Sequence, residues 1–310
     1  MPAKQLPLFP GPGEHTLTRN SPLSQAIPPF LERLRSEGRS IHTIKAFSSD
    51  LNLLSEFFGD ATPLKEFTTS RLNQFMEWIE HGRGVPCSRK SYARRVTTLK
   101  VFFKFLRAER VIPSDPAAAL LQRSGAAPLQ PVLSENDIRR LLAHTQSLRF
   151  ADKPDARPDL LVRLLLDTAI KKGECMALTL DHIRRDNSAE PYLVIRHRKP
   201  NNVYKERKIA LDPDWLTVLD EFVEQYRPKE NLFECTARNL EYVLSDAAKG
   251  AGIDGKVSFE ILRWTSAVRD YRRGIDMDEL REKMGLSRIS WRETGDKIVQ
   301  LAALQNEQLP

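Results

Sequence analysis

The sequence predicts a mainly α-helical protein with a small β-sheet, divided into an N-terminal helical domain and a C-terminal α+β domain. Three observations predict this fold class. Apolar residues recur at steps of three and four over most of the chain, one pair of β-type segments stands in its second half, and a Pro- and Gly-rich stretch separates the halves. The 310 residues, 41% of them hydrophobic, suffice for two domains with cores of their own.

Proline and glycine punctuate the chain and set the expected domain boundaries. The first residues contain Leu6-Pro-Leu-Phe-Pro-Gly-Pro-Gly, a composition typical of disorder. Pro113, Pro116, Pro128 and Pro131 mark the change of domain. We therefore expect a disordered tail over 1–21, a helical domain over 22–123, a linker over 124–133, an α+β domain over 134–296, and a C-terminal helix or tail over 297–310.

Amphipathic helices account for the first domain. One apolar stripe runs from Ile44 to Phe58 and another from Tyr92 to Leu106, each at helical spacing. Thr68 or Thr69 and then Ser88 precede such stripes as candidate N-caps. The helices are therefore expected to pack on one another through these stripes.

The second domain opens with a helix and contains one hairpin. Ser134-Glu-Asn-Asp137 has the spacing of a capping box. Tyr192–Arg196 and Arg207–Leu211 are β-type segments on either side of Lys199-Pro-Asn-Asn, which favours a turn. In addition, Ile298, Leu301 and Leu304 predict a short helix over 297–308.

The charge distribution points to a polyanionic partner. Lys and Arg number 48 against 41 Asp and Glu, a net charge of +7. Between Arg83 and Arg110 there are nine Lys or Arg and a single acid, Glu109. A surplus of eight on one predicted helix suits several contacts with phosphates, although a solvated basic face would have the same composition.

Other classes of protein are disfavoured. Three Cys, odd in number and far apart, support neither a disulfide framework nor a CxxC zinc site, and the six His show no ligand spacing. No cofactor or metal is therefore expected. The sequence shows no signal-peptide core and no apolar run long enough for a membrane span, so we expect a cytoplasmic protein that does not enter the membrane.

Three segments near the C-terminus carry a family resemblance. Val257-Ser-Phe-Glu-Ile-Leu-Arg-Trp-Thr-Ser-Ala-Val268, Gly274-Ile-Asp-Met-Asp and Met284-Gly-Leu-Ser-Arg-Ile-Ser290 follow one another in order. Their layout resembles the signature of the tyrosine recombinases (the phage-integrase family). The resemblance implies a helical SAM-like core-binding domain, then a catalytic-type α+β domain that brings six side chains to one DNA phosphate.

The resemblance also assigns positions to the catalytic residues, and most of them are substituted. Thr168-Ala-Ile-Lys-Lys-Gly-Glu174 matches the motif that carries the first Arg of the family. Lysine there keeps the charge but loses the bidentate grip of Arg on phosphate. The expected positions are Lys171 for the first Arg, Lys199 for the hairpin lysine, Glu260 for the first His, Arg263 for the second Arg, Trp264 and Leu286 for later His residues, and Gly295 for the nucleophilic Tyr.

These substitutions favour binding without cleavage. A carboxylate at Glu260 repels phosphate, and no Tyr follows Tyr271. Arg263 could instead pair with Glu174 or Glu260, and Lys171 with Glu260; Lys199 could be an ordinary residue of a hairpin tip. Ser290 and Thr294 are interpreted as capping or surface residues, and His182 and His197 as surface residues.

The expected function is that of a double-stranded DNA-binding protein that has lost strand cleavage. It would bend, bridge or coat DNA in the nucleoid, or assist an active recombinase, and could self-associate on DNA through its C-terminal helix. Alternatives are an active recombinase with a displaced or trans-supplied nucleophile and a protein–protein adaptor. The expected DNA contacts are Lys45, Arg89, Lys90, Arg94, Arg95, Lys100, Lys104, Lys171, Lys199 and Arg263.

Overall fold

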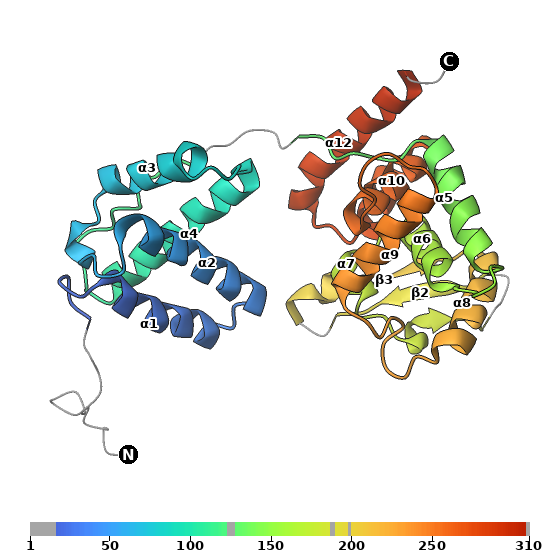
Figure 1. Ribbon diagram of the computed structural model, residues 1–310, viewed down its shortest axis with the longest axis horizontal. Coiled ribbons are helices and arrows are strands. Elements are labelled where there is room, and N and C mark those ends of the chain that lie inside the picture. Colours follow the sequence, from blue (N-terminus) through green and yellow to red (C-terminus); the bar gives the residue numbers. More distant parts are fainter. Residues whose placement is uncertain (1–16, 123–127, 187–189, 198–199, 308–310) are drawn as a thin grey trace. The chain divides into compact units, whose positions relative to one another are not determined.

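The chain divides into two compact units, residues 1–127 and 128–310 (Figure 1). The structure is a computed structural model that describes residues 17–122, 128–186, 190–197 and 200–307. Each unit has its own hydrophobic core. The mainly helical fold with a small sheet, predicted from the sequence, is confirmed.

The N-terminal unit is helical throughout its regular structure. Thr68 and Ser88 act as the N-caps, each accepting a hydrogen bond from the main-chain N–H three residues on. The elements are α1 (Leu23–Ser36), α2 (Ile41–Phe58), a 3₁₀ turn (Leu64–Glu66), α3 (Thr69–Glu77), a π-helical turn (Trp78–Gly82) and α4 (Arg89–Ala108).

Aromatic side chains form the centre of this unit. Phe30 of α1 meets Phe102 of α4 edge to face, with ring centroids 5.2 Å apart. Leu51 and Leu54 of α2 are fully buried in the same core, and so is Val96 of α4. The apolar face of α4 is thereby fixed inward, and its opposite face is turned to solvent.

The C-terminal unit combines eight helices with a three-stranded antiparallel sheet in the described part of the chain. The predicted hairpin is confirmed: Leu193 pairs with Ile209 across it, and a 3₁₀ turn (Pro200–Lys205) precedes its second strand. The elements are α5 (Glu135–Leu148), α6 (Arg157–Thr168), α7 (Lys172–Cys175), β1 (Ile183–Arg184), β2 (Tyr192–Ile195), β3 (Arg207–Ala210), α8 (Pro213–Tyr226), α9 (Ala237–Gly250), α10 (Phe259–Arg272), α11 (Met277–Lys283) and α12 (Arg288–Glu307).

Helix α6 lies at the centre of this unit, in contact with α5, α8, α9 and α10. Its residues Leu160, Leu161, Val162, Leu164 and Leu165 are all fully buried. These five leucine and valine side chains spread over more than half of the helix circumference, so several elements must pack around α6 to bury them. The C-terminal end of α6 therefore holds the following motif at a fixed place.

The C-terminal helix differs from the prediction. A single helix, α12, runs from Arg288 to Glu307, so it begins well before the expected start near residue 297. Its residues Ile298, Leu301 and Ala302 are buried in a cluster with residues of α10 and α11. Burial of this apolar face stabilises the helix through Gly295, a residue that disfavours helix by about 1 kcal/mol relative to Ala.

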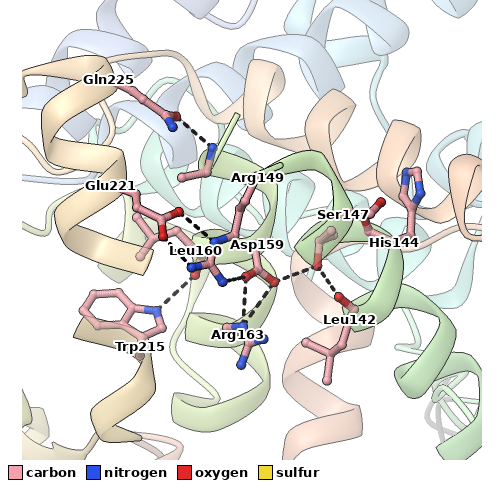
Figure 2. Close-up of polar contacts among 12 residues, drawn as sticks. Leu142, His144, Ser147, Arg149, Asp159, Leu160, Arg163, Trp215, Glu221 and Gln225 are labelled. Atoms are coloured by element: carbon pink, nitrogen blue, oxygen red, sulfur yellow. Dashed lines mark hydrogen bonds and ion pairs between the residues drawn. The ribbon is translucent and has the colours of Figure 1, made fainter. Parts of the chain in front are cut away.

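An ion network ties α5, α6 and α8 together (Figure 2). The carboxylate of Asp159, fully buried, accepts from Thr145 Oγ1 at 2.8 Å and from Arg149 Nη1 at 3.2 Å. Arg149 also donates to both carboxylate oxygens of Glu221, at 2.6 and 2.8 Å, and Arg163 Nε lies 3.1 Å from Asp159. Each charged group in the network has a partner of opposite charge, so the burial of Asp159 leaves no unpaired charge in the core.

We expect Asp159→Ala to reduce the free energy of unfolding of the C-terminal unit by about 3–5 kcal/mol, because it leaves two arginines without their buried partner. Urea unfolding followed by tryptophan fluorescence measures the change. The control is Asp220→Ala, which removes an exposed ion pair with Arg185 in the same unit and is expected to change the free energy of unfolding far less. Equal effects of the two substitutions would contradict this account.

Candidate nucleic-acid interface

The motif of Lys171 begins where α6 ends. Ala169 adopts a left-handed conformation with φ 50°, at the position where the family motif has Gly. The chain then turns into the short helix α7, and the main-chain N–H of Lys171 donates to Glu174 Oε2 at 2.8 Å. This bond directs Lys171 and Glu174 to the same small region of the C-terminal unit.

Glu174 is paired with Arg207 of β3, a residue that the sequence interpretation did not select. Arg207 Nη1 and Nη2 donate to the two carboxylate oxygens of Glu174 at 3.1 and 2.8 Å. Burial raises the pKa of Glu174, but the bonds from Arg207 and from the N–H of Lys171 outweigh it and hold the pKa below its usual value. The considered pair between Glu174 and Arg263 is therefore wrong.

Arg263 on α10 is buried, with only 5% of its surface exposed. One terminal nitrogen donates to the carbonyl of Ala169, and the other donates to the carbonyl of Met284 at 2.7 Å. Burial, with help from Arg207, lowers its pKa to about 10. Both arms of the guanidinium fork are thus bound to main chain.

The same loop engages three further cations. Residues 283–286 comprise the last residue of α11 and the three that follow it. The last carbonyls of a helix lack partners in the helix and lie at the negative end of its dipole. We call this set of bonds the carbonyl clamp. Its members are Arg207 Nε to Lys283 O at 2.7 Å, Arg263 Nη2 to Met284 O at 2.7 Å, Lys171 Nζ to Gly285 O at 2.7 Å and Arg281 Nη1 to Leu286 O at 3.3 Å.

Gly285 is necessary for this arrangement. Its φ is 58°, in the left-handed region, and a Cβ there would lie 2.6 Å from Nη1 of Arg207. The guanidinium of Arg207 therefore lies directly against the backbone of the loop. The glycine of the Met284-Gly-Leu segment permits this close approach.

The side chains at the positions expected for His residues contact each other or pack in the core. Trp264 Nε1 donates to Glu260 Oε1 at 2.9 Å. Trp264 is buried, and Leu286 packs against its cluster. Glu260 is exposed, and Lys171 donates to Gly285 and not to Glu260, so the considered Lys171–Glu260 pair is wrong.

Gly295, the position expected for the nucleophile, lies within α12. A Cβ there would be 3.1 Å from Cε of Met277 and 3.3 Å from the ring of Trp291. Thr294 Oγ1 donates to the carbonyl of Ser290, and Ser290 Oγ lies 3.1 Å from Ser287 Oγ. The Thr294 hydroxyl bonds within α12, and the Ser290 hydroxyl bonds to the residue just before the helix, in agreement with their interpretation as capping or surface residues.

The expected DNA contacts of the N-terminal unit lie mostly on the exposed face of α4. Lys45, Arg89, Lys90 and Lys104 are exposed, and Arg94 and Lys100 are half-buried. We call Arg89, Lys90, Arg94, Lys100 and Lys104 the basic face. At about 100° per residue they occupy one side of the helix.

Arg95 departs from the expectation, because it is buried on the other side of α4. It projects about 140° away from Lys90 around the helix. Its Nη1 lies 2.7 Å from Cys87 Sγ and its Nε lies 3.6 Å from Asp50, a buried carboxylate that Arg94 Nη2 also approaches at 3.0 Å. Burial raises the pKa of Asp50, and the two arginines and Thr98 oppose this shift.

A pocket of about 810 Å³ opens beside Lys171 in the C-terminal unit. It is lined by basic residues that the sequence interpretation did not assign to binding: His182, Arg196, His197 and Lys205. Lys199, the expected hairpin lysine, lies outside the described residues. In the described part of the chain, His, Cys, Asp and Glu form no group that could hold a metal ion, and no helix has the length and apolarity needed to cross a membrane.

Relatives of known sequence are recombinases. Tyrosine recombinase XerD of Listeria innocua serovar 6a is 25% identical over 283 residues, covering 86% of this chain and 92% of its own. Tyrosine recombinase XerC of Mycobacterium tuberculosis (strain ATCC 25177 / H37Ra) is 32% identical over 148 residues, which is 47% of this chain and 49% of that protein.

Solved structures share the fold. XerH site-specific recombinase, bound to palindromic difH substrate in a post-cleavage complex, matches with a TM-score of 0.76 at 16% identity, over 96% of this chain and 97% of that chain. A lambda integrase dimer bound to a COC' core site gives 0.68 at 18% identity, over 88% and 76%.

Family models agree with both units. The model of the phage integrase N-terminal SAM-like domain matches residues 27–110, which include the basic face. The model of the phage integrase family matches residues 131–293, which include the carbonyl clamp. With both domains matched in order along one chain, the protein belongs to the phage integrase family, the tyrosine recombinases.

Proposed function

We propose that this protein binds duplex DNA on a recombinase scaffold without cutting it, as an architectural factor of the nucleoid or an accessory factor of an active recombinase. One contrast supports both halves of the proposal. Lys171 and Arg263, two of the cations expected at a reacting phosphate, donate to the chain's own carbonyls, whereas Lys90 and Lys104 of the basic face are exposed. Lys171 and Arg263 are engaged within the chain, and Lys90 and Lys104 lie at a surface that a partner can reach.

Binding is supported by the chemistry of the basic face. Nonspecific contact with DNA comes mainly from Lys and Arg near phosphates, and it requires no exact convergence of side chains. Lys90 and Lys104 project from one side of α4, and Lys45 on α2 adds an exposed charge. The relatives named XerH and lambda integrase have been solved as complexes with their DNA sites.

Absence of cleavage is supported by three features of the C-terminal unit. Gly295 offers no nucleophile, and Glu260 places a carboxylate where the family has a His. Each terminal nitrogen of Arg263 already donates to a main-chain carbonyl, which leaves fewer N–H donors for a developing oxyanion. Self-association on DNA belongs to the same proposal, because α12 exposes Ile289, Val299 and Leu304.

The basic face is expected to set the salt dependence of DNA binding. In Lys90→Ala/Lys104→Ala, the slope of log K against log salt should fall by about 2, one unit for each lost phosphate contact. Fluorescence anisotropy on random duplexes at several salt concentrations measures the slope. Arg35→Ala/Lys65→Ala removes the same charge elsewhere on the N-terminal unit and serves as the control. An unchanged slope in the first variant excludes the basic face from the interface.

On a nicked suicide duplex, the protein should form no covalent adduct resistant to SDS, because no Tyr stands at residue 295. Gly295→Tyr alone should also remain inactive, since Lys171 still lacks the bidentate fork of Arg, and Glu260 and Leu286 still lack the donors of His. Denaturing gels of labelled DNA provide the measurement, with an active recombinase on its own substrate as positive control. A covalent adduct with the wild-type chain would favour the alternative, an enzyme with a displaced or trans-supplied nucleophile.

The carbonyl clamp should depend on the Arg207–Glu174 pair. Arg207→Met leaves a buried carboxylate unpaired and is expected to cost about 3–5 kcal/mol of unfolding free energy. Adding Glu174→Gln removes that charge and should recover part of the loss, so a double-mutant cycle shows coupling. Hydrogen exchange at residues 284–288 should rise in Arg207→Met. Strictly additive effects with unchanged exchange would mean that the pair does not hold the loop.

A further inference from the structure

Two cysteines that are far apart in the sequence lie near each other in the C-terminal unit. Cys175 is the last residue of α7 and is fully buried in the core of that unit. Cys235, in the segment between α8 and α9, is half-buried and packs against the same core. The main-chain N–H of Leu232 donates to the carbonyl of Leu178 at 2.7 Å. Each cysteine is three residues from one end of this bond, which holds their two segments side by side.

The Cys235 thiol is close enough to influence the ionisation of Cys175. Burial is the main cause that raises the pKa of Cys175, and charge repulsion from Cys235 raises it further. Repulsion between two charged groups falls with the distance between them, so this effect requires neighbouring sulfurs. The packing, the main-chain bond and the electrostatics therefore agree that the two thiols are neighbours.

Cys235 is the thiol that a reagent in solvent can reach. Burial raises its pKa, and Arg157 at the start of α6 opposes this shift. The guanidinium of Arg157 lies 5.1 Å from the ring centroid of Tyr226, and its Nε has no hydrogen-bond partner among the described residues. Burial and the hydrogen bond to Asp155 raise the pKa of Tyr226 to about 12, so this hydroxyl stays neutral. Arg157 is thus the group placed to stabilise a thiolate at Cys235.

We propose that Cys175 and Cys235 form a reversible disulfide when the protein meets a small-molecule disulfide as oxidant. The Cys235 thiolate attacks one sulfur of the oxidant, and the other sulfur leaves as a thiolate. The Cys175 thiolate then attacks Cys235 Sγ and releases the remaining sulfur of the oxidant as a second thiolate. The two protons lost by the protein pass through water to these leaving groups. Two protein thiols become one disulfide, and the oxidant is reduced to two small thiols.

The disulfide would tie α7 to the segment that precedes α9. Helix α7 follows Lys171 and contains Glu174, the carboxylate that Arg207 holds. Closing a loop of about 60 residues removes conformational freedom from the unfolded chain, so a bond that suits the native geometry stabilises the fold. No step of the reaction requires DNA, and the inference is therefore independent of the proposed function.

Oxidised glutathione tests the pair on the full chain and on Cys175→Ser, Cys235→Ser and Cys87→Ser. The last variant is the control, because Cys87 belongs to the N-terminal unit. Mildly alkaline buffer is used, since burial raises the pKa of both Cys175 and Cys235 and a higher pH increases their thiolate fractions. Mass spectrometry of peptides cut without reduction identifies each bond. The same oxidation in urea shows which pairs an unfolded chain forms.

We expect one intramolecular Cys175–Cys235 bond in the folded wild type and in Cys87→Ser, and no bond within the chain in Cys175→Ser or Cys235→Ser. Oxidation should raise the thermal midpoint of the C-terminal unit by about 5–10 °C in the first two proteins only.

Four results would overturn the proposal. They are thiols that all stay free, a Cys235 that remains bound to glutathione beside a free Cys175, a Cys175–Cys235 bond that forms only in urea, and a bond that fails to raise the midpoint. The last result would mean that the fold has to distort before the two sulfurs can join.

Discussion

The arrangement of the C-terminal unit around Lys171 and Arg263 depends on the charged hydrogen bonds at the end of α11. A helix end presents carbonyls without partners and a partial negative charge, and these features attract cations as an anion does. Arg207, Arg263 and Lys171 each donate to one of three successive carbonyls, 283 to 285. Hydrogen bonds of this kind contribute about 1.5–3 kcal/mol each, so a phosphate must offer more than the loop does to replace it.

This constraint explains how the fold tolerates its substitutions. Glu174 would be a buried bare carboxylate without Arg207, and Arg263 would be a buried bare cation without the carbonyls of Ala169 and Met284. Each charge is satisfied inside the chain, so no bound DNA is needed to stabilise it. Glu260 is likewise held by Trp264. The core of the unit therefore does not depend on a bound phosphate to compensate these charges.

Sequence patterns were sufficient to predict the elements whose decisive interactions are local. Thr68, Ser88 and Ser134 cap helices three residues on, and the hairpin pairs neighbouring segments, so short-range pattern predicted them. Arg207 was missed because its partner Glu174 is 33 residues away and only the folded chain joins them. The same limit applies to α12, where tertiary packing of Ile298 and Leu301 outweighs the helix penalty of a glycine.

Arg94 and Arg95 show how sequence patterns fail to separate two neighbouring residues. Composition treats them alike, but one step along a helix rotates the side chain by about 100°, so Arg95 enters the core and Arg94 reaches its edge. The same distinction bears on function. Binding DNA requires only that charges lie along a surface, as on the basic face, whereas cutting requires several donors and a nucleophile to converge on one phosphorus. On the proposed function, affinity for the duplex needs only the charges along the basic face, and it does not depend on the convergence of donors that cutting requires.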